Sequence, residues 1–520
     1  MEFHILSWVT FFPLIGIALI LIAPRQLSRW IALATGFGTV ILGVVILGRF
    51  DGSIGAMGAD GIQMLEQMAW IPSLGIDYRV GVDGISILMV LLTQLIALVG
   101  IVASWNIDKS PKGYYSLYLL LQAGMTGVFV SLDFVLFYVF WEVMLLPMYF
   151  LIGIWGGPRK EYAAIKFFLY TLFGSVLMLL AIISLYINMK VPSFNMLAMM
   201  DPAAYRVDSW LVSDAGTWLF GFAPKQLVWL AFYIGFAIKI PAFPFHTWLP
   251  DAHVEAPTPI SVILAGVLLK MGTYGILRVN FQMMPEVTLG FLDFIAILGL
   301  VNIIYGALAA LAQKDLKSLI AYSSISHMGF VMLGMASLGD PAGLNGAMLQ
   351  MFNHGCITGM LFLLVGIIYD RAHHRNIDGF GGIWVATPVY TGFVALAWFA
   401  AVGLPGLSGF ISEFLIFVGA FKSHQFLAIL AITGIVLGAA YMLWALQRIW
   451  MGPLNPKYES LPEITWREIA TLVPLAIIVI FVGVYPAPVL DLIGPTMGSL
   501  YDYLNTVAIG GVHTAAAANF

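Results

Sequence analysis

The stretch GISILMVLLTQLIALVGIVASW (residues 84–105) contains 22 residues and no charged side chain. A helix needs about 20 predominantly apolar residues to cross the hydrocarbon core of a bilayer. Backbone groups in lipid must satisfy their own hydrogen bonds, and a run this uniformly apolar lacks the alternation of a barrel strand. The stretch therefore predicts a membrane-spanning α-helix.

Similar runs recur along the whole chain of 520 residues, of which 61% are hydrophobic and only 10% are charged. Soluble domains carry about 25% charged residues, so a soluble protein is excluded. Hydropathy predicts fourteen spans, near residues 5–23, 30–48, 84–105, 115–131, 133–155, 164–188, 227–249, 257–280, 289–312, 316–338, 343–368, 387–421, 427–451 and 468–490. The expected fold class is an all-α membrane protein built as a helical bundle.

Loop charges give the expected orientation. Counted in order, the odd-numbered loops hold thirteen of the 23 Lys and Arg residues and the even-numbered loops hold seven. Positive residues favour the cytoplasmic side, so the odd loops are predicted there and both termini on the opposite side. The tail after Tyr503 is small and polar, and we expect it to be disordered or draped on a neighbour.

Charge and cysteine content restrict the possible partners. The net charge is −4 and no basic cluster occurs, so nucleic acid is not an expected partner. The single cysteine, Cys356, excludes an intramolecular disulfide and a cysteine-ligated iron–sulfur cluster in this chain. No residues at metal-ligand spacing were found, and no metal site is predicted.

Ionisable residues inside the predicted spans are the strongest functional signal. They are costly at mid-span, and each is by default a functional hypothesis. One lone histidine is more often a packing residue, but six groups on six spans point to a path. Burial disfavours the charged forms of Lys and Glu, and a nearby opposite charge restores them, so such groups can exchange protons, with His titrating between them. The candidate relay residues are Glu142, Lys239, Lys270, His327, His354 and Glu413.

Two of these residues lie beside helix breaks. Lys239 leads into the segment KIPAFP (239–244), whose two prolines cannot both sit in an unbroken helix. The segment GLPGLSG (403–409) precedes Glu413 by four residues. Broken helices at membrane depth line hydrated cavities, and paired breaks in two halves of a chain indicate a transport pathway.

Several neighbouring polar residues rank lower. Lys166 is expected to extend to the cytoplasmic interface. His246 and His253 are expected at the interface rather than in the path, and Asp251 beside them does not complete a metal site.

Longer motifs add a resemblance to a known family. The chain contains HTWLPDAH (246–253), LLKMGTYG (268–275), AYSSISHMGFV (321–331), MFNHG (351–355) and PGLSGFISEF (405–414). These motifs resemble the antiporter-like membrane subunits of respiratory complex I, the NADH:quinone oxidoreductase. The similarity extends from GVDGIS (81–86) to about Gly452.

The resemblance implies roles for the six residues. Glu142 matches the family's essential glutamate of the fifth helix, and Lys239 matches the lysine that pairs with it. Lys270 matches the central lysine of helix eight, and His327 and His354 match histidines of the hydrophilic axis. At the position of Glu413 the sister chains of types L and N usually carry Lys and type M carries Glu, so the resemblance points to type M.

The family also implies an architecture. Its fold has fourteen helices with two inverted five-helix repeats and with helices 7 and 12 broken. The expected divisions are 1–110 (helices 1–3), 111–282 (first repeat), 283–452 (second repeat) and 453–520 (helix 14 and tail).

The implied activity is proton translocation in a bacterial inner membrane, driven by quinone reduction in other subunits. No cofactor is expected in this chain; flavin, iron–sulfur clusters and quinone would belong to partners, and L- and N-type subunits would flank it. Three alternatives remain. The chain could belong to a multisubunit sodium/proton antiporter, to a hydrogenase-type membrane complex, or to a membrane arm in which it is only a scaffold.

Overall fold

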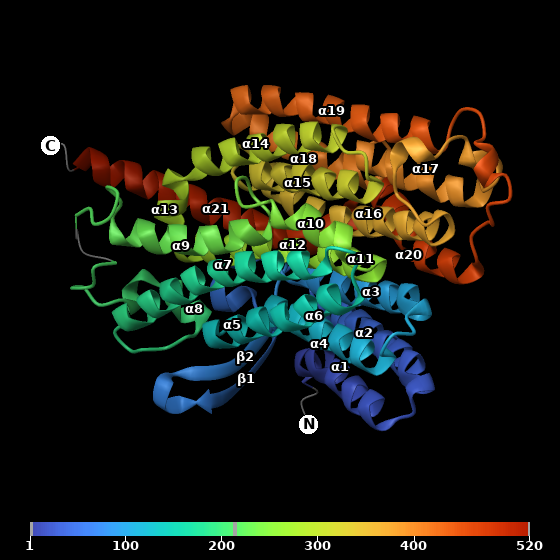
Figure 1. Ribbon diagram of the computed structural model, residues 1–520. Coiled ribbons are helices and arrows are strands. Elements are labelled where there is room, and N and C mark those ends of the chain that lie inside the picture. Colours follow the sequence, from blue (N-terminus) through green and yellow to red (C-terminus); the bar gives the residue numbers. More distant parts are fainter. Residues whose placement is uncertain (1–3, 212–215, 518–520) are drawn as a thin grey trace.

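The fold is a bundle of roughly parallel helices, seen side-on in the computed structural model (Figure 1). Residues 4–211 and 216–517 are described. The helices are α1 (Ile5–Ile22), α2 (Ser28–Arg49), α3 (Ile87–Ala103), α4 (Pro111–Val130), α5 (Phe134–Val143), α6 (Leu145–Trp155), α7 (Lys160–Asn188), α8 (Met196–Met199), α9 (Pro224–Lys239), α10 (Trp248–Glu255), α11 (Thr258–Ile263), α12 (Leu269–Gly275), α13 (Pro285–Gly290), α14 (Leu292–Leu311), α15 (Leu316–Met335), α16 (Ala342–Ala372), α17 (Pro388–Val402), α18 (Ser408–Ser423), α19 (Gln425–Ile449), α20 (Trp466–Val484) and α21 (Ala487–Ala517).

The membrane character of the bundle follows from helix length and composition. Within the described residues, eleven helices are long and apolar enough to cross a membrane, and each coincides with a predicted span. The other three predicted spans correspond to α4, to α9 with α10, and to α17 with α18. The all-α membrane fold is confirmed, whereas the count of fourteen spans and the two inverted repeats remain predictions.

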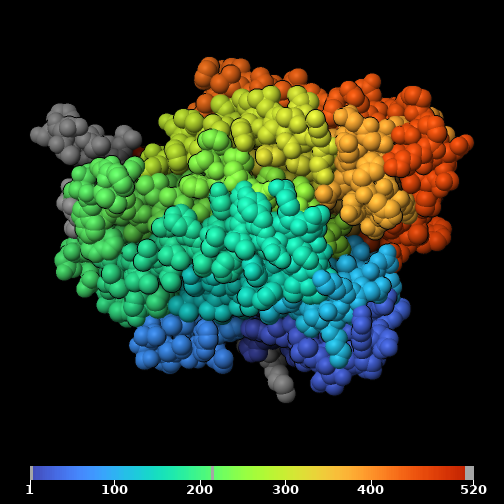
Figure 2. All heavy atoms as spheres, viewed as in Figure 1, coloured from blue at the N-terminus to red at the C-terminus, as the bar shows by residue number. Residues whose placement is uncertain are grey.

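The burial of the helices differs sharply from the centre of the bundle to its edge. The segment 258–281 and α16 are buried throughout the windows that would cross the membrane, whereas only 33% of the window of α2 and 28% of that of α19 is buried. Figure 2 shows that side chains of the segments around α7 cover the middle of one face, with the N-terminal segments along its lower edge. The most buried helices therefore form a core that the less buried helices flank.

The break in the seventh span is stabilised by a side chain from another helix. α9 ends at Lys239 and α10 begins only at Trp248. Asn302 of α14 accepts a hydrogen bond from the Phe243 backbone N–H (2.7 Å) and donates one to the Pro241 carbonyl (3.2 Å). Because buried backbone groups must find partners, Asn302 replaces the hydrogen bonds that the prolines remove.

The break in the twelfth span has a corresponding support. α17 ends at Val402, and Gly403 then takes a left-handed conformation with φ +83°. α18 begins at Ser408, whose carbonyl accepts a hydrogen bond from Asn353 Nδ2 of α16 at 2.8 Å. Each predicted break is therefore present and is held by an asparagine of a neighbouring helix.

A two-stranded hairpin departs from the all-helical expectation. β1 (Gln63–Ile71) and β2 (Ile76–Val82) pair antiparallel within the long loop 49–83. The buried Glu66 of β1 accepts hydrogen bonds from the backbone N–H groups of Leu6 (2.7 Å) and Ser7 (3.0 Å). A carboxylate at this position satisfies the open N–H groups of a helix start, so the hairpin caps α1.

The tail after Tyr503 is helical rather than disordered, and its packing on a neighbouring subunit stays a prediction. α21 continues through Tyr503 to Ala517. Its buried residues Ile493, Met497, Leu500 and Leu504 recur at helical spacing, and α21 packs against α13 and α16. An apolar stripe and the high helix propensity of alanine explain why this segment is helical despite its weak hydropathy.

Candidate functional site

Four of the predicted relay residues form a connected row in the centre of the bundle. Lys270 Nζ of α12 lies 2.7 Å from His354 Nδ1 of α16, at hydrogen-bond distance. The rings of His354 and His327 of α15 have centroids 5.8 Å apart. His327 Nδ1 lies 3.2 Å from Glu413 Oε1 of α18. We call Lys270, His354, His327 and Glu413 the central row.

Uncharged polar side chains hold the far end of the central row. Gln350 Nε2 donates to Glu413 Oε1 at 3.4 Å, and Gln350 Oε1 accepts from Ser412 Oγ at 2.5 Å. A small cavity lies here, lined by residues that include His327, His354 and Glu413. The carboxylate is thus positioned by hydrogen bonds while it still faces open space.

Lys270 lies between two irregular segments of its helix. The π-helical segments η6 (Leu264–Leu268) and η7 (Ile276–Phe281) flank α12, and Lys270 Nζ donates to the Ala265 carbonyl at 2.5 Å. π-Helical turns leave carbonyls out of the regular ladder and are frequent at functional sites. The sequence gave no sign of this irregularity, since no proline occurs between residues 260 and 284.

Glu142 and Lys239, which we call the front pair, are arranged differently. Both residues lie close enough to interact electrostatically, yet no ion pair joins them within the described residues. Lys239 Nζ lies over the rings of Trp141 (5.3 Å) and Phe167 (5.4 Å), contacts that favour a cation. Glu142 Oε1 and Lys239 Nζ are buried and have no hydrogen-bond partner among the described residues.

A buried ion pair near the opposite end of the Lys270 helix was not predicted. Arg278 of η7 donates to both carboxylate oxygens of Asp83, each at 2.7 Å, and both residues are almost fully buried. Arg278 also contacts Tyr274 and Gln282. Hydropathy places Arg278 at the end of a predicted span, and its burial follows from its pairing with Asp83, which lies 195 residues away in sequence, just before α3. This bidentate pair anchors the segment that carries Lys270.

Two lower-ranked residues have different surroundings from those expected. Lys166 Nζ donates to Asp251 Oδ2 at 2.7 Å, and the Lys166 side chain is 19% exposed. His253 is fully buried in α10, where its ring is stacked on Phe362 of α16. In both cases a neighbouring helix covers a residue that hydropathy placed near the end of a span.

Lys317 is a further buried cation that the sequence did not single out. It was counted among the loop lysines, but it begins α15, is 3% exposed and donates to the Ala256 carbonyl at 2.5 Å. A signal was present, since Lys317 falls one residue inside the predicted span 316–338.

Together these features define a class of protein. A helical membrane bundle whose core holds a connected row of Lys, His and Glu, beside two broken helices, is an ion-translocating membrane protein. The row contains groups that exchange protons and lacks a cluster of metal-ligating residues in the parts of the chain that are described.

Comparisons with known proteins narrow this class. The family described as "NADH:quinone oxidoreductase/Mrp antiporter, TM" matches residues 131–438. NADH-quinone oxidoreductase subunit M of Rhodobacter capsulatus is 42% identical over 99% of this chain and 100% of that protein. A chain of respiratory complex I from Thermus thermophilus superposes with a TM-score of 0.83 at 28% identity, covering 96% of this chain and 99% of that one. A chain of the Mrp complex from Dietzia, at 21% identity and a TM-score of 0.80, covers 98% of this chain and 100% of its own length and shares the fold alone.

The chain therefore belongs to the family of NADH-quinone oxidoreductase subunit M, within the wider group of antiporter-like membrane subunits. The family and the type predicted from Glu413 are both confirmed.

Proposed function

We propose that this chain translocates protons as a membrane subunit of NADH:quinone oxidoreductase, using the six buried residues as a relay. The observation that carries the proposal is the central row, in which Lys270 meets His354 and His327 meets Glu413 at hydrogen-bond distance, with 5.8 Å between the two ring centroids. No comparable arrangement is needed to stabilise a bundle, since buried ionisable groups cost free energy.

Proton movement along the central row follows from its geometry. Protonated Lys270 gives its proton to His354 Nδ1, which leaves a neutral amine and an imidazolium. Water between the two rings carries the proton from His354 to His327, whose Nδ1 then delivers it to Glu413. Neutral Glu413 releases the proton into the cavity beside it. Each step moves one proton between groups of the kind used for proton transfer in proteins.

The front pair would supply protons to the central row. Lys239 and Glu142 favour each other's charged form, so a change in their separation or hydration takes up or releases a proton. The two helix breaks lie beside Lys239 and Glu413, which supports one half-path in each of the repeats predicted at 111–282 and 283–452.

The energy for this movement would come from outside the chain. We infer that quinone reduction in partner subunits, which would hold the flavin, the iron–sulfur clusters and the quinone, drives the cycle. L- and N-type subunits would flank the chain in a bacterial inner membrane, with both termini on the non-cytoplasmic side.

The second candidate function is that of a subunit in a multisubunit sodium/proton antiporter, because the description of the matching family names the Mrp antiporter beside the oxidoreductase. Subunits that co-purify with the chain discriminate the two. Peripheral flavin and iron–sulfur proteins support the oxidoreductase, whereas small membrane proteins alone support the antiporter. A hydrogenase-type complex would be recognised in the same way.

Glu142→Gln and Lys239→Ala in the assembled complex test the relay. Each variant should lower proton pumping by at least about tenfold, since a lost proton donor or acceptor costs roughly 10²–10⁴. Pumping is measured in membrane vesicles, and assembly is checked on native gels. Lys422→Ala is the matched control, because Lys422 is an exposed lysine paired with Asp340 at the end of α18. Wild-type pumping in intact complexes of both variants would show that the relay is wrong and would favour the scaffold.

A further inference from the structure

Two lysine side chains meet at the end of α6. Lys109, in the loop before α4, and Lys160, the first residue of α7, donate to the same Ile154 carbonyl, at 2.9 Å and 3.2 Å. Because both Nζ atoms bond one oxygen, the sum of these distances limits their separation to about 6 Å. Gly156 permits this approach, since a Cβ atom there would lie 2.8 Å from the Lys160 Cβ. We call Lys109 and Lys160 the lysine pair.

Neighbouring carboxylates do not neutralise the lysine pair. Asp108 pairs with Arg29 at 3.8 Å, and Glu255 pairs with Arg159 at 3.6 Å. Glu161 is exposed, and no carboxylate forms an ion pair with either lysine among the described residues. Two like charges this close repel each other, so an anion that contacts both is favoured. Each ammonium has three donors and gives one to the α6 carbonyl, which leaves others for that anion.

The partly exposed side of α4 leads from these lysines into an apolar groove. In the first half of α4 the incompletely buried residues recur about one turn apart, and they are Lys112, Gly113, Ser116, Leu117 and Leu120. Leu120 also lines a groove of about 600 Å³ between α1, α4 and α5, together with Phe11, Leu14, Ala123, Val139 and Val143. Because Leu14 and Val139 are exposed, the groove opens at the side of the bundle.

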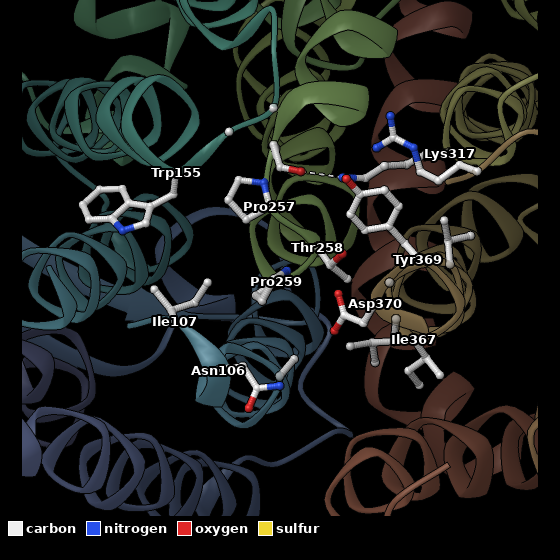
Figure 3. A pocket seen from close by; sticks show the side chains of 18 of the residues that line it. Asn106, Ile107, Trp155, Pro257, Thr258, Pro259, Lys317, Ile367, Tyr369 and Asp370 are labelled. Atoms are coloured by element: carbon white, nitrogen blue, oxygen red, sulfur yellow. Dashed lines mark hydrogen bonds between the residues drawn. The ribbon is translucent and has the colours of Figure 1, made fainter. Parts of the chain in front are cut away.

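A third lysine lies at the same end of α4. Lys112 Nζ donates to the Leu21 carbonyl at 3.0 Å, near the end of α1, as the lysine pair does at the end of α6. Since α4 packs against both α1 and α6 (Figure 1), cations cap the helices on both sides of it. Trp155 Nε1 donates to the Lys109 carbonyl at 2.6 Å, and Figure 3 shows its ring near Ile107 at one side of the adjacent cavity. Basic and tryptophan residues at the end of a bundle are typical of the lipid headgroup level.

We propose that an anionic phospholipid binds at this end of the bundle, with its phosphate on the lysine pair and an acyl chain in the groove along α4. The phosphate oxygens would accept hydrogen bonds from both ammonium groups and neutralise their charge. A lipid of the phosphatidylglycerol type fits better than a zwitterionic lipid, whose own cationic group would meet the lysines. The loops here belong to the predicted cytoplasmic set, where basic residues contact anionic lipids.

The alternative is that the lysine pair only caps the carbonyl end of α6, which attracts cations by itself. Photolabelling separates the two without any substitution. The assembled complex is reconstituted in phosphatidylcholine vesicles with a trace of phosphatidylglycerol or phosphatidylcholine that carries a diazirine in the acyl chain, and labelled residues are mapped by mass spectrometry. Phosphatidylglycerol should label α4 and α5 around Leu120 and Val139 several-fold more than phosphatidylcholine does. Equal labelling by the two lipids would overturn the site.

Removing the two charges should remove this preference. In Lys109→Gln/Lys160→Gln, labelling by phosphatidylglycerol should fall by about fivefold or more, the attraction expected from one lysine near an anionic lipid. Lys109→Arg/Lys160→Arg keeps both charges and should keep the labelling. Lys457→Gln is the matched control, because Lys457 is an exposed lysine of another predicted cytoplasmic loop. Undiminished labelling in the Gln variant, with assembly checked on native gels, would leave the lysines as helix caps and overturn the proposal.

The groove and the kind of anion are tested separately. Leu120→Trp should obstruct the groove and lower the labelling of Val139, whereas Leu180→Trp, at an exposed leucine of α7, should not. Equal labelling of Val139 in both variants would overturn the groove as the acyl-chain site. Inorganic phosphate, compared with chloride at equal ionic strength, should not displace the lipid, because a free anion has no acyl chain for the groove. Displacement by phosphate alone would assign the lysine pair to a soluble anion and overturn the lipid site.

Discussion

The central row and the front pair hold the same kinds of ionisable group in opposite states. In the central row hydrogen bonds join Lys270 to His354 and His327 to Glu413, and the two histidine rings lie 5.8 Å apart. In the front pair, Lys239 lies over two aromatic rings and no hydrogen bond satisfies its Nζ or Glu142 Oε1 among the described residues. Hydrogen bonds join residues within the central row, whereas no hydrogen bond joins the two residues of the front pair.

From this difference we expect proton affinity to change at the front pair rather than in the central row. A group with fixed partners has a defined proton affinity, whereas two unpaired charges at short range change theirs with small displacements. Pro241 and Pro244 lie between α9 and α10, so the segment after Lys239 is the part of this region that is not held by a helical ladder. We therefore expect substitutions in the central row to stop transfer and substitutions around the front pair to alter it.

The largest effect is expected from Glu413→Gln, which breaks the end of the central row. The amide cannot take a proton from His327, so pumping should fall by roughly 10²-fold or more. Pumping in vesicles measures this, with Glu413→Asp as the control that keeps a carboxyl group. If Glu413→Gln pumps like the wild type, the row does not end at Glu413.

A smaller effect is expected at the two helix breaks. Asn302→Ala leaves the Phe243 N–H and the Pro241 carbonyl without their partner, and Asn353→Ala does the same to the Ser408 carbonyl. An unsatisfied buried group costs about 1–3 kcal/mol. Thermal unfolding of the purified complex should show a lower Tm for both variants, with the larger decrease for Asn302→Ala, because it loses two backbone contacts. Equal decreases would indicate that water replaces the second contact.

A modest change is expected from Trp141→Phe in the front pair. The smaller ring weakens a cation–π contact worth about 0.5–2 kcal/mol without removing the aromatic face over Lys239. This weakening should change proton pumping only a few-fold. The large loss of pumping expected for Glu413→Gln is the contrast. Trp398→Phe, at a buried tryptophan that contacts Trp450, is the control for the loss of indole volume. A complete loss of pumping in Trp141→Phe alone would mean that the front pair is as fixed as the central row.

The smallest effect is expected from a substitution at Asp340, in the loop before α16. Asp340 accepts a hydrogen bond from Lys422 at 2.5 Å, and this contact lowers the pKa of the Asp340 carboxyl below its ordinary value. Any stability from the pair is therefore present above the carboxyl's ordinary pKa and is lost as the pH falls through its lowered value. Exposed pairs contribute little, so Asp340→Asn should leave pumping unchanged and should remove a small acid-dependent decrease in Tm. A large loss of pumping would place Asp340 in the path.

Much of the candidate site was predictable from the sequence. Apolar runs predict spans because the bilayer requires about 20 apolar residues regardless of neighbours. Lys270, His327 and His354 stand out because charged or titratable groups inside such runs are rare, and Pro241, Pro244 and the glycines near Pro405 mark breaks by local chemistry. These signals are local, so one sequence is enough to read them.

The tertiary structure alone decided which of these groups meet. Glu142 and Lys239 remain unpaired although both were predicted, while Lys270 bonds His354 from a helix 84 residues away in sequence. Lys317, His253 and Arg278 looked like residues of loops or interfaces, and they are buried because other helices cover them. The hydropathy of a segment reports its affinity for lipid, but the burial of a single side chain depends on which distant helix packs over it. The apolar stretch 84–105 thus determined that the chain crosses a membrane, and the packing around it determined which ionisable groups meet.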